Sequence, residues 1–218
     1  MISTRNMFAN PADLAVSLAN DVASSLRAAI AEKGTAVLAV SGGTTPQKFF
    51  EALSQAKLDW AKVSVTLVDE RMVDETSPRS NARLVKQALI QNEAASARFV
   101  PLYQYPNAAK VANFDVAVLG MGNDGHTASF FPGGTTLQEA INPATTATLL
   151  EISAPGSGEP RLTFTLPKLL ASAHLLLHVQ GQDKWATLET ALAGTDQMEM
   201  PVRAVLQSAT PVQLYWCP

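Results

Sequence analysis

Apolar residues recur every four positions near the start of the chain, at Leu14, Leu18, Val22, Leu26 and Ile30. This spacing keeps their side chains on one face of a helix. Asn10 followed by Pro11 suits the N-cap and the first helical position, and Gly34 suits the end of the helix. The pattern therefore predicts an amphipathic helix between Asn10 and Gly34.

Short apolar runs without polar alternation predict strands that are buried on both faces, which is typical of a parallel sheet covered by helices. We expect strands at Thr35–Val40, Val63–Val68, Asp115–Leu119, Thr145–Ile152, Arg161–Leu166, Ala173–Val179 and Val212–Trp216. Between them we expect helical segments at Pro46–Leu53, Leu84–Leu89, a short one ending at Val111, Pro167–Ser172, Gly181–Leu192 and Val202–Gln207. Such alternation is the signature of right-handed βαβ units, so the predicted fold class is α/β, with a mainly parallel sheet flanked by helices.

The length and composition of the chain narrow its function class. Its 218 residues fit one domain, 1–218, and a composition of 47% hydrophobic and 16% charged residues excludes a disordered or fibrous protein. The net charge of −3 argues against a nucleic-acid partner, so any cationic site must be built locally. No apolar run is long enough for a signal peptide or a membrane span, and Cys217 has no second cysteine to pair with, so we expect a cytoplasmic protein. The sequence leaves the oligomeric state open.

A glycine-rich turn between a predicted strand and a predicted helix is the first candidate binding site: Ser41, Gly42, Gly43, Thr44 and Thr45. Its glycines let several backbone N–H groups point inward, and the start of the next helix adds partial positive charge, so the turn suits a phosphate group. The lysine of a nucleotide-binding P-loop is absent, so ATP is not implied. A plain tight turn between strand and helix remains the alternative.

A second glycine-rich turn, Gly120-x-Gly122-x-x-Gly125, formally matches the dinucleotide-binding fingerprint. That fingerprint needs a long helix directly afterwards and an acidic residue at the end of the next strand. Here Pro132-Gly133-Gly134 interrupts any helix, and no acidic strand end follows at the required distance. We therefore interpret these glycines as shaping a loop that exposes Asp124 and His126 at the carboxyl end of a central strand, where open parallel sheets bind ligands.

His126 is the strongest candidate for acid–base chemistry, because it lies in a loop close to an acid and imidazole titrates near neutral pH, at roughly 6.5. His174 and His178 fall on one face of a predicted strand, where we expect structural roles, buried or at a sheet edge. A metal site at this pair would need a further ligand, and the His-x-x-x-His spacing supports zinc mainly on helices. The residues therefore predict no metal site.

Charged residues at the ends of other predicted elements are weaker candidates. Asp69-Glu70-Arg71 ends a predicted strand and so reaches the same edge of the sheet, although a solvated charged turn is the alternative. Arg161 begins a strand after a flexible loop over Ala154–Pro160, and Lys184 lies in the first turns of a helix. Taken separately, these charges are ordinary surface residues.

The order of these motifs resembles the 6-phosphogluconolactonase family, within the wider group that includes glucosamine-6-phosphate deaminase. The resemblance spans about Val37 to Leu192 and rests on Ser41–Pro46, Asp69–Arg71 with Ser80-Asn81, Gly120–Gly133, Arg161–Pro167 and Gly181-x-x-Lys184. An ordered set of this kind is far more specific than any one of its members.

The resemblance implies a NagB-like fold, a Rossmann-type sheet flanked by helices. It also implies hydrolysis of a small sugar-phosphate lactone, 6-phospho-D-glucono-1,5-lactone, to 6-phospho-D-gluconate in the oxidative pentose phosphate pathway, with no metal and no organic cofactor. His126 would be the catalytic base, and Asp124 or Asp69 would orient the imidazole or the attacking water.

The resemblance also implies how the substrate is held. The Ser41–Thr45 turn, Arg161 and Lys184 would bind the phosphate, and Arg71 would face the sugar acid. Because the chain carries net negative charge, these cations would have to gather locally.

Two alternatives remain. In glucosamine-6-phosphate deaminase the segment after the histidine provides a glutamate, and a tyrosine follows the aspartate–glutamate pair. This chain has Thr127–Pro132 and Arg71 at those places, which favours the lactonase. A sugar-phosphate sensor that binds without turnover would normally carry a DNA-binding segment, for which we expect no room before the helix at Asn10.

Overall fold

The structure, a computed structural model, describes residues 1–155 and 157–218. In these residues the main sheet has seven strands, all parallel, in the order β1-β10-β9-β6-β2-β3-β5. They are β1 (Ile2–Met7), β2 (Ala36–Val40), β3 (Val63–Leu67), β5 (Arg98–Val100), β6 (Val116–Leu119), β9 (His174–Gln180) and β10 (Val212–Cys217). The sheet confirms the predicted α/β class.

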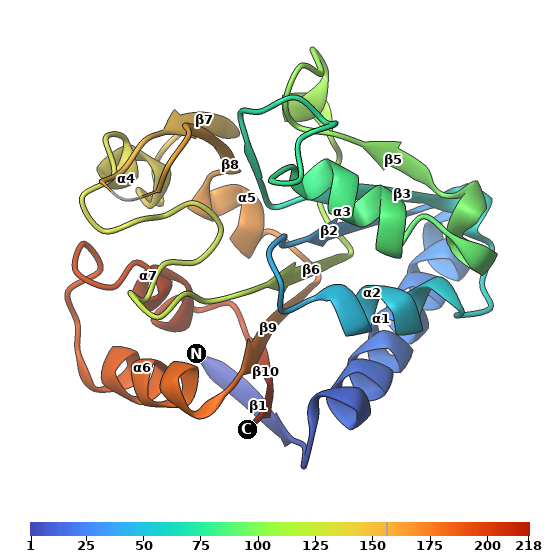
Figure 1. The fold of residues 1–218 in the computed structure, drawn as a ribbon, viewed down its shortest axis with the longest axis horizontal. Coiled ribbons are helices and arrows are strands. Elements are labelled where there is room, and N and C mark those ends of the chain that lie inside the picture. Colours follow the sequence, from blue (N-terminus) through green and yellow to red (C-terminus); the bar gives the residue numbers. More distant parts are fainter. Residues whose placement is uncertain (156) are drawn as a thin grey trace.

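Helices flank this sheet on both sides. The α-helices are α1 (Pro11–Lys33), α2 (Gln47–Ser54), α3 (Asn81–Ala88), α4 (Leu137–Ala140), α5 (Leu166–Leu170), α6 (Gln182–Ala193) and α7 (Val202–Leu206). Short 3-10 helices are η1 (Trp60–Lys62), η2 (Asn92–Ser96) and η3 (Ala108–Lys110). Figure 1 shows α1 and α2 on one side of the strands and α6 and α7 on the other. The strands between them are almost wholly buried, as their apolar runs predict.

The first helix forms where the apolar spacing predicts it, and both of its ends are capped. The side-chain oxygen of Asn10 accepts hydrogen bonds from the N–H groups of Ala12 and Asp13, at 2.9 and 3.0 Å. Gly34 ends α1 with a left-handed φ of 83°, and its N–H donates to the carbonyl of Ile30. The apolar face of α1 is buried against the sheet and α2.

A second, smaller sheet was not among the predicted elements. It contains β4 (Asp69–Arg71), β7 (Leu149–Ile152) and β8 (Arg161–Phe164), in the antiparallel order β4-β8-β7. Asp69–Arg71 is therefore a strand of its own and not the tail of β3. Asp69 and Glu70 are 6% and 2% exposed, so the interpretation as a solvated turn is wrong.

Two strands of the small sheet are shorter than predicted. The strand expected over Thr145–Ile152 begins at Leu149, because the N–H of Thr145 closes a turn onto the carbonyl of Asn142. The strand expected over Arg161–Leu166 ends at Phe164, because the chain turns into α5 from Thr165 onwards. The helix expected over Leu84–Leu89 begins three residues earlier, at Asn81, because the Ser80 side chain caps it. The other predicted elements agree with the structure to within a residue or two at each end.

β1 and β5 have no counterpart among the predicted strands. Ile2–Met7 is mostly polar, and Arg98–Val100 has only three residues, so neither shows an apolar run. Both lie at edges of the main sheet, where a strand can expose one side to solvent. The short helix expected to end at Val111 is η3. Of the loop expected over Ala154–Pro160, Gly156 lies outside the described residues.

The order in which the chain adds strands to the main sheet reverses between the neighbouring strands β2 and β6. From β2 it proceeds through β3 to the edge strand β5, and from β6 it proceeds through β9 to β10 on the other side. Open parallel sheets bind ligands outside the carboxyl ends of the strands at such a point. The turn at Ser41 follows β2 and the turn at Gly120 follows β6, so both glycine-rich turns lie there.

Candidate active site

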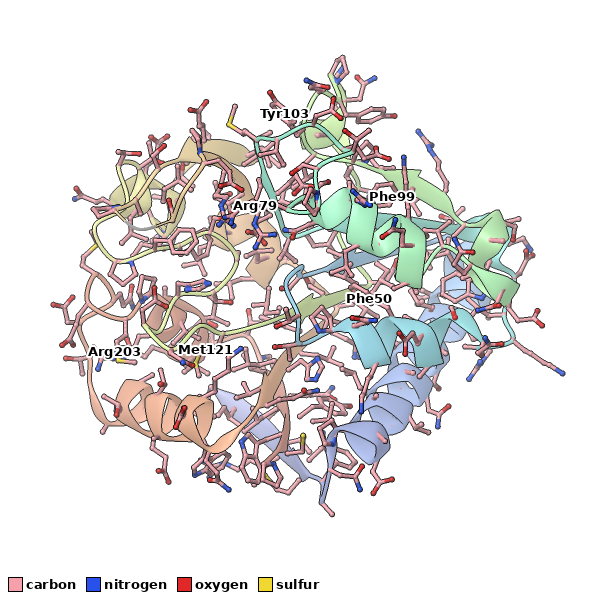
Figure 2. All side chains as sticks on the ribbon, viewed as in Figure 1. Phe50, Arg79, Phe99, Tyr103, Met121 and Arg203 are labelled. Atoms are coloured by element: carbon pink, nitrogen blue, oxygen red, sulfur yellow. The ribbon has the colours of Figure 1, made fainter. Side chains whose placement is uncertain are left out.

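A cavity of about 220 Å³ lies at the carboxyl ends of β2 and β6. This volume suits a small ligand, since pockets for drug-sized molecules measure ~300–1,000 Å³. Phe50 of α2 and Met121 of the turn after β6, both labelled in Figure 2, form part of the wall. The lining includes all the predicted site residues except Asp124: Ser41, Gly42, Gly43, Thr44, Thr45, Asp69, Arg71, His126, Arg161 and Lys184.

The turn after β2 presents backbone donors to this cavity. Within the described residues, the N–H groups of Gly42, Gly43, Thr44 and Thr45 have no hydrogen-bond acceptor. Gly43 has a left-handed φ of 89°, a conformation that glycine adopts without strain. The turn leads directly into α2, whose first N–H groups carry partial positive charge. The turn therefore has the properties of an anion-binding loop.

Ser41 joins this turn to the turn after β6. Its N–H and its hydroxyl both donate to the carbonyl of Val118, at 3.0 and 3.1 Å. Its hydroxyl oxygen accepts from the N–H of Gly120 at 3.0 Å. Because these groups are already engaged, Ser41 contributes by holding the two turns together, and the free donors belong to the residues after it.

His126 is held on the turn after β6 by its close contacts with Gly122 and Asp124. The N–H of Gly122 donates to the carbonyl of His126 at 3.0 Å, and a Cβ on Gly122 would lie 2.2 Å from the imidazole ring. Gly125 has a left-handed φ of 77°. The ring also packs against Phe131, with 4.5 Å between the ring centroids. The interpretation of these glycines as a loop that presents His126 therefore agrees with the structure.

Asp124 contacts both the imidazole and the backbone of His126. Its Oδ1 lies 2.5 Å from Nδ1 of the ring and also accepts from the backbone N–H of His126 at 3.1 Å. Burial acts to raise the pKa of Asp124, but the hydrogen bond and charge of His126 outweigh burial and lower it. An ionised carboxylate accepts the Nδ1 proton, so Nε2 of a neutral ring remains free to accept another proton.

Asp69 has different partners from Asp124. Its Oδ2 accepts from the hydroxyl of Ser129 at 2.5 Å, and a nitrogen of Arg161 lies 4.0 Å away. The contact with His126 therefore belongs to Asp124, and Asp69 supports the cationic side of the cavity.

Arg71 and Arg161 lie opposite each other on β4 and β8. Arg71 donates to the carbonyl of Arg79 at 2.5 Å, and Arg161 donates to the carbonyl of Ser157 at 3.0 Å. The Nε of each arginine is buried and has no partner among the described residues. Burial lowers the pKa of Arg161, with Asp69 opposing that effect and Arg71 adding to it. The two arginines line the cavity together, and Asp69 lies near Arg161, so this part of the wall favours an anionic or oxygen-rich ligand.

Lys184 has a different contact from those of the two arginines. Its Nζ donates to the hydroxyl of Thr45 at 3.3 Å, from the first turn of α6 to the glycine-rich turn after β2. Burial lowers the pKa of Lys184. The resemblance groups Lys184 with Arg161, whereas in the structure Lys184 contacts the anion-binding loop and Arg161 contacts the small sheet.

The sequence similarity of the chain extends over nearly its whole length. A family model described as glucosamine-6-phosphate isomerases/6-phosphogluconolactonase matches residues 9–216. The chain belongs to this family. A 6-phosphogluconolactonase of Rhizobium meliloti (strain 1021) is 51% identical over 100% of both chains. The crystal structure of a 6-phosphogluconolactonase from Shewanella baltica OS155 covers 100% of both chains, with a TM-score of 0.95 at 38% identity.

A more distant structure shows how widely the fold is shared. A monomeric glucosamine-6-phosphate deaminase, described as a missing link of the NagB superfamily, has a TM-score of 0.78 at 16% identity, and covers 98% of this chain and 97% of its own. The match confirms the NagB-like fold that the resemblance implies, and at this identity it shows the fold alone.

Glu70 and Asn81 belong to the motifs that carry the resemblance, but the sequence predicts no role for either, and Asn81 lines the cavity. The Glu70 carboxylate accepts from the N–H groups of Asn81 and Ala82 at the start of α3, at 2.8 and 2.7 Å. Asn81 in turn donates to the carbonyl of Asp69 and accepts from Arg71, at 3.1 and 3.3 Å. Glu70 therefore fixes the helix start that holds Arg71. The usable signal was an acid shortly before a Ser-Asn helix start.

Two further features of the described residues concern function. They contain no group of three or more His, Cys, Asp or Glu side chains that could hold a metal ion. None of their helices combines the length and the apolar character needed to cross a membrane.

Proposed function

We propose that this chain hydrolyses 6-phospho-D-glucono-1,5-lactone to 6-phospho-D-gluconate, the lactone-opening step of the oxidative pentose phosphate pathway. The observation that carries the proposal is that His126 and the anion-binding loop line the same cavity. A single phosphorylated sugar lactone can then present its C1 carbonyl to the imidazole and its phosphate to the loop. Full-length similarity to relatives that bear the name 6-phosphogluconolactonase supports the same reaction.

In the proposed mechanism His126 acts first as base and then as acid. Nε2 takes a proton from a water molecule while the water oxygen bonds to C1 of the lactone. The bond between C1 and the ring oxygen then breaks, and the imidazolium returns its proton to that oxygen. General acid–base help of this kind contributes about 10²–10⁴-fold. Asp124 keeps the ring in the orientation and tautomer that the first step requires.

The contacts divide the binding residues between the two ends of the substrate. We assign the phosphate to Lys184 and to the N–H groups of Gly42–Thr45, which lie together. We assign Arg71 and Arg161 to the sugar acid and the charge that develops at C1, because Phe131 contacts both the His126 ring and Arg161. Holding both ends places C1 against the base.

The test compares initial rates of lactone opening at neutral pH for 6-phosphogluconolactone and unphosphorylated gluconolactone, after subtraction of spontaneous hydrolysis. We expect rapid opening of the phosphorylated lactone and a much higher KM for the other. Binding of 6-phosphogluconate without any acceleration would indicate a sensor and overturn the proposal.

A parallel incubation with glucosamine 6-phosphate tests the deaminase alternative, since the family description also names glucosamine-6-phosphate isomerases. We expect no ammonia, because the segment Thr127–Pro132 after the histidine carries no carboxylate. Rapid ammonia release would make the chain a deaminase.

A further inference from the structure

His178 lines the candidate active-site cavity, although its position on a strand predicts only a structural role. It lies near the carboxyl end of β9 and is 2% exposed. Phe49 of α2 packs edge-on against its ring, with 6.3 Å between the ring centroids. The ring is therefore fixed in place by the core while part of it borders the cavity.

The hydrogen bond between His178 and Gln180 locates the proton on the ring. Nε2 of His178 lies 2.8 Å from Nε2 of Gln180. An amide nitrogen can only donate, so the ring Nε2 accepts, and a neutral ring carries its proton on Nδ1. Burial, together with the charge of Lys184, lowers the pKa of His178 to about 3, so the ring is neutral at physiological pH.

Nδ1 of His178 is an unused donor. It has no hydrogen-bond partner among the described residues. Unlike the unpartnered Nε atoms of Arg71 and Arg161, it is not fully buried. Since the residue is almost wholly buried and borders the cavity, the accessible part of the ring faces the cavity.

The surroundings of this donor indicate what it binds. Lys184 is close enough for its charge to act on the ring, and the Nζ of Lys184 contacts Thr45 of the anion-binding loop. We infer that His178 donates a hydrogen bond from Nδ1 to the phosphate of the substrate, beside Lys184, and so contributes to selection of phosphorylated lactones. The inference rests on the proposed function. The dianion of a phosphate monoester offers only acceptors, and a neutral donor adds a directed bond without repelling Lys184.

Three variants test the inference. His178→Leu removes the donor, His178→Asn keeps an amide donor near the position of Nδ1, and His174→Leu is the control from the exposed end of the same strand. For His178→Leu we expect KM for the phosphorylated lactone and Kd for 6-phosphogluconate to rise about 10- to 100-fold, the range for a lost hydrogen bond to a charged group. We expect kcat and the rate with unphosphorylated gluconolactone to change less than threefold. His178→Asn should recover most of the affinity, and His174→Leu should match the wild type.

A second measurement does not depend on mutation. In ¹⁵N-labelled wild-type protein, we expect the Nδ1 resonance of His178 to show a bound proton and to shift when inorganic phosphate or 6-phosphogluconate is added. An unchanged Nδ1 resonance together with unchanged KM and Kd in folded His178→Leu would overturn the inference. Equal losses with the phosphorylated and unphosphorylated lactones would also overturn it, because they would indicate a structural role. Absence of lactone hydrolysis by the wild type would instead overturn the proposed function.

Discussion

His126 and His178 border the same cavity in opposite surroundings. His126 lies on a turn, its side chain is 30% exposed, and Nδ1 contacts the carboxylate of Asp124 at 2.5 Å. His178 lies on a central strand, is buried, contacts an amide, and has the cation Lys184 nearby. Burial beside a lysine keeps the His178 ring neutral, whereas the His126 ring is partly exposed and lies beside a carboxylate. In the roles proposed for them, His126 transfers protons and His178 donates a neutral hydrogen bond.

Replacing His126 should have the largest effect on turnover. We expect His126→Asn to lower kcat about 10²–10⁴-fold, because the water loses its base and the ring oxygen loses its acid. The Kd for 6-phosphogluconate should change far less, since the phosphate contacts remain. Steady-state kinetics and calorimetry check both parts, and His174→Asn is the matched control. Retained hydrolysis in folded His126→Asn would end the distinction between the two histidines.

Replacing the two acids separates their roles. We expect Asp124→Asn to lower kcat by less than the about 10²–10⁴-fold loss expected for His126→Asn, with little change in the Kd for 6-phosphogluconate, because the imidazole loses the carboxylate that contacts Nδ1. Asp69→Asn should instead weaken 6-phosphogluconate binding, because Asp69 contacts Ser129 and Arg161 and not His126. Steady-state kinetics and calorimetry distinguish the outcomes. Weaker binding with unchanged kcat in Asp124→Asn, and lower kcat with unchanged Kd in Asp69→Asn, would reverse the assignment.

The sequence predicts those parts of the fold that depend on local pattern. The spacing in α1 and the apolar runs of β2 and β6 are strong signals, and they place both glycine-rich turns at the same edge of the sheet. The small sheet gives no such signal, because β4 is made of charged residues whose burial depends on partners far away in the chain. Edge strand β1 is similarly hidden by its polar residues.

The candidate site shows the same division. The turn residues and His126 are recognisable because they directly follow apolar strand runs, at the edge where open parallel sheets bind ligands. The pairing of Arg71 with Arg161 depends on the register of two strands that are distant in sequence, and no local pattern reveals it. For His178, strand alternation places it on a face with His174 but does not show that its end of the strand borders the cavity.

The last effect, small for each unit of pH, is on acid stability, and it tests directly whether the folded chain keeps His178 neutral. In the unfolded chain this histidine binds a proton near pH 6.5, whereas in the folded chain its pKa is about 3. Between these values the unfolded state holds more protons, so the free energy of unfolding falls as pH is lowered, by up to about 1.4 kcal/mol per pH unit from this one group. Above about pH 6.5 neither state holds the proton on His178, and this loss of stability is absent.

His178→Asn removes this proton uptake. Relative to the wild type, its free energy of unfolding should therefore rise by up to about 1.4 kcal/mol for each unit of pH lowered between pH 6 and pH 4. Urea unfolding at several pH values gives this difference, and differences cancel the titration of the carboxylates that both proteins share. His174→Asn, from the exposed end of the strand, should follow the wild type. Parallel curves for wild type and His178→Asn would mean that the folded cavity accepts a charged ring beside Lys184, and the contrast with His126 would then be lost.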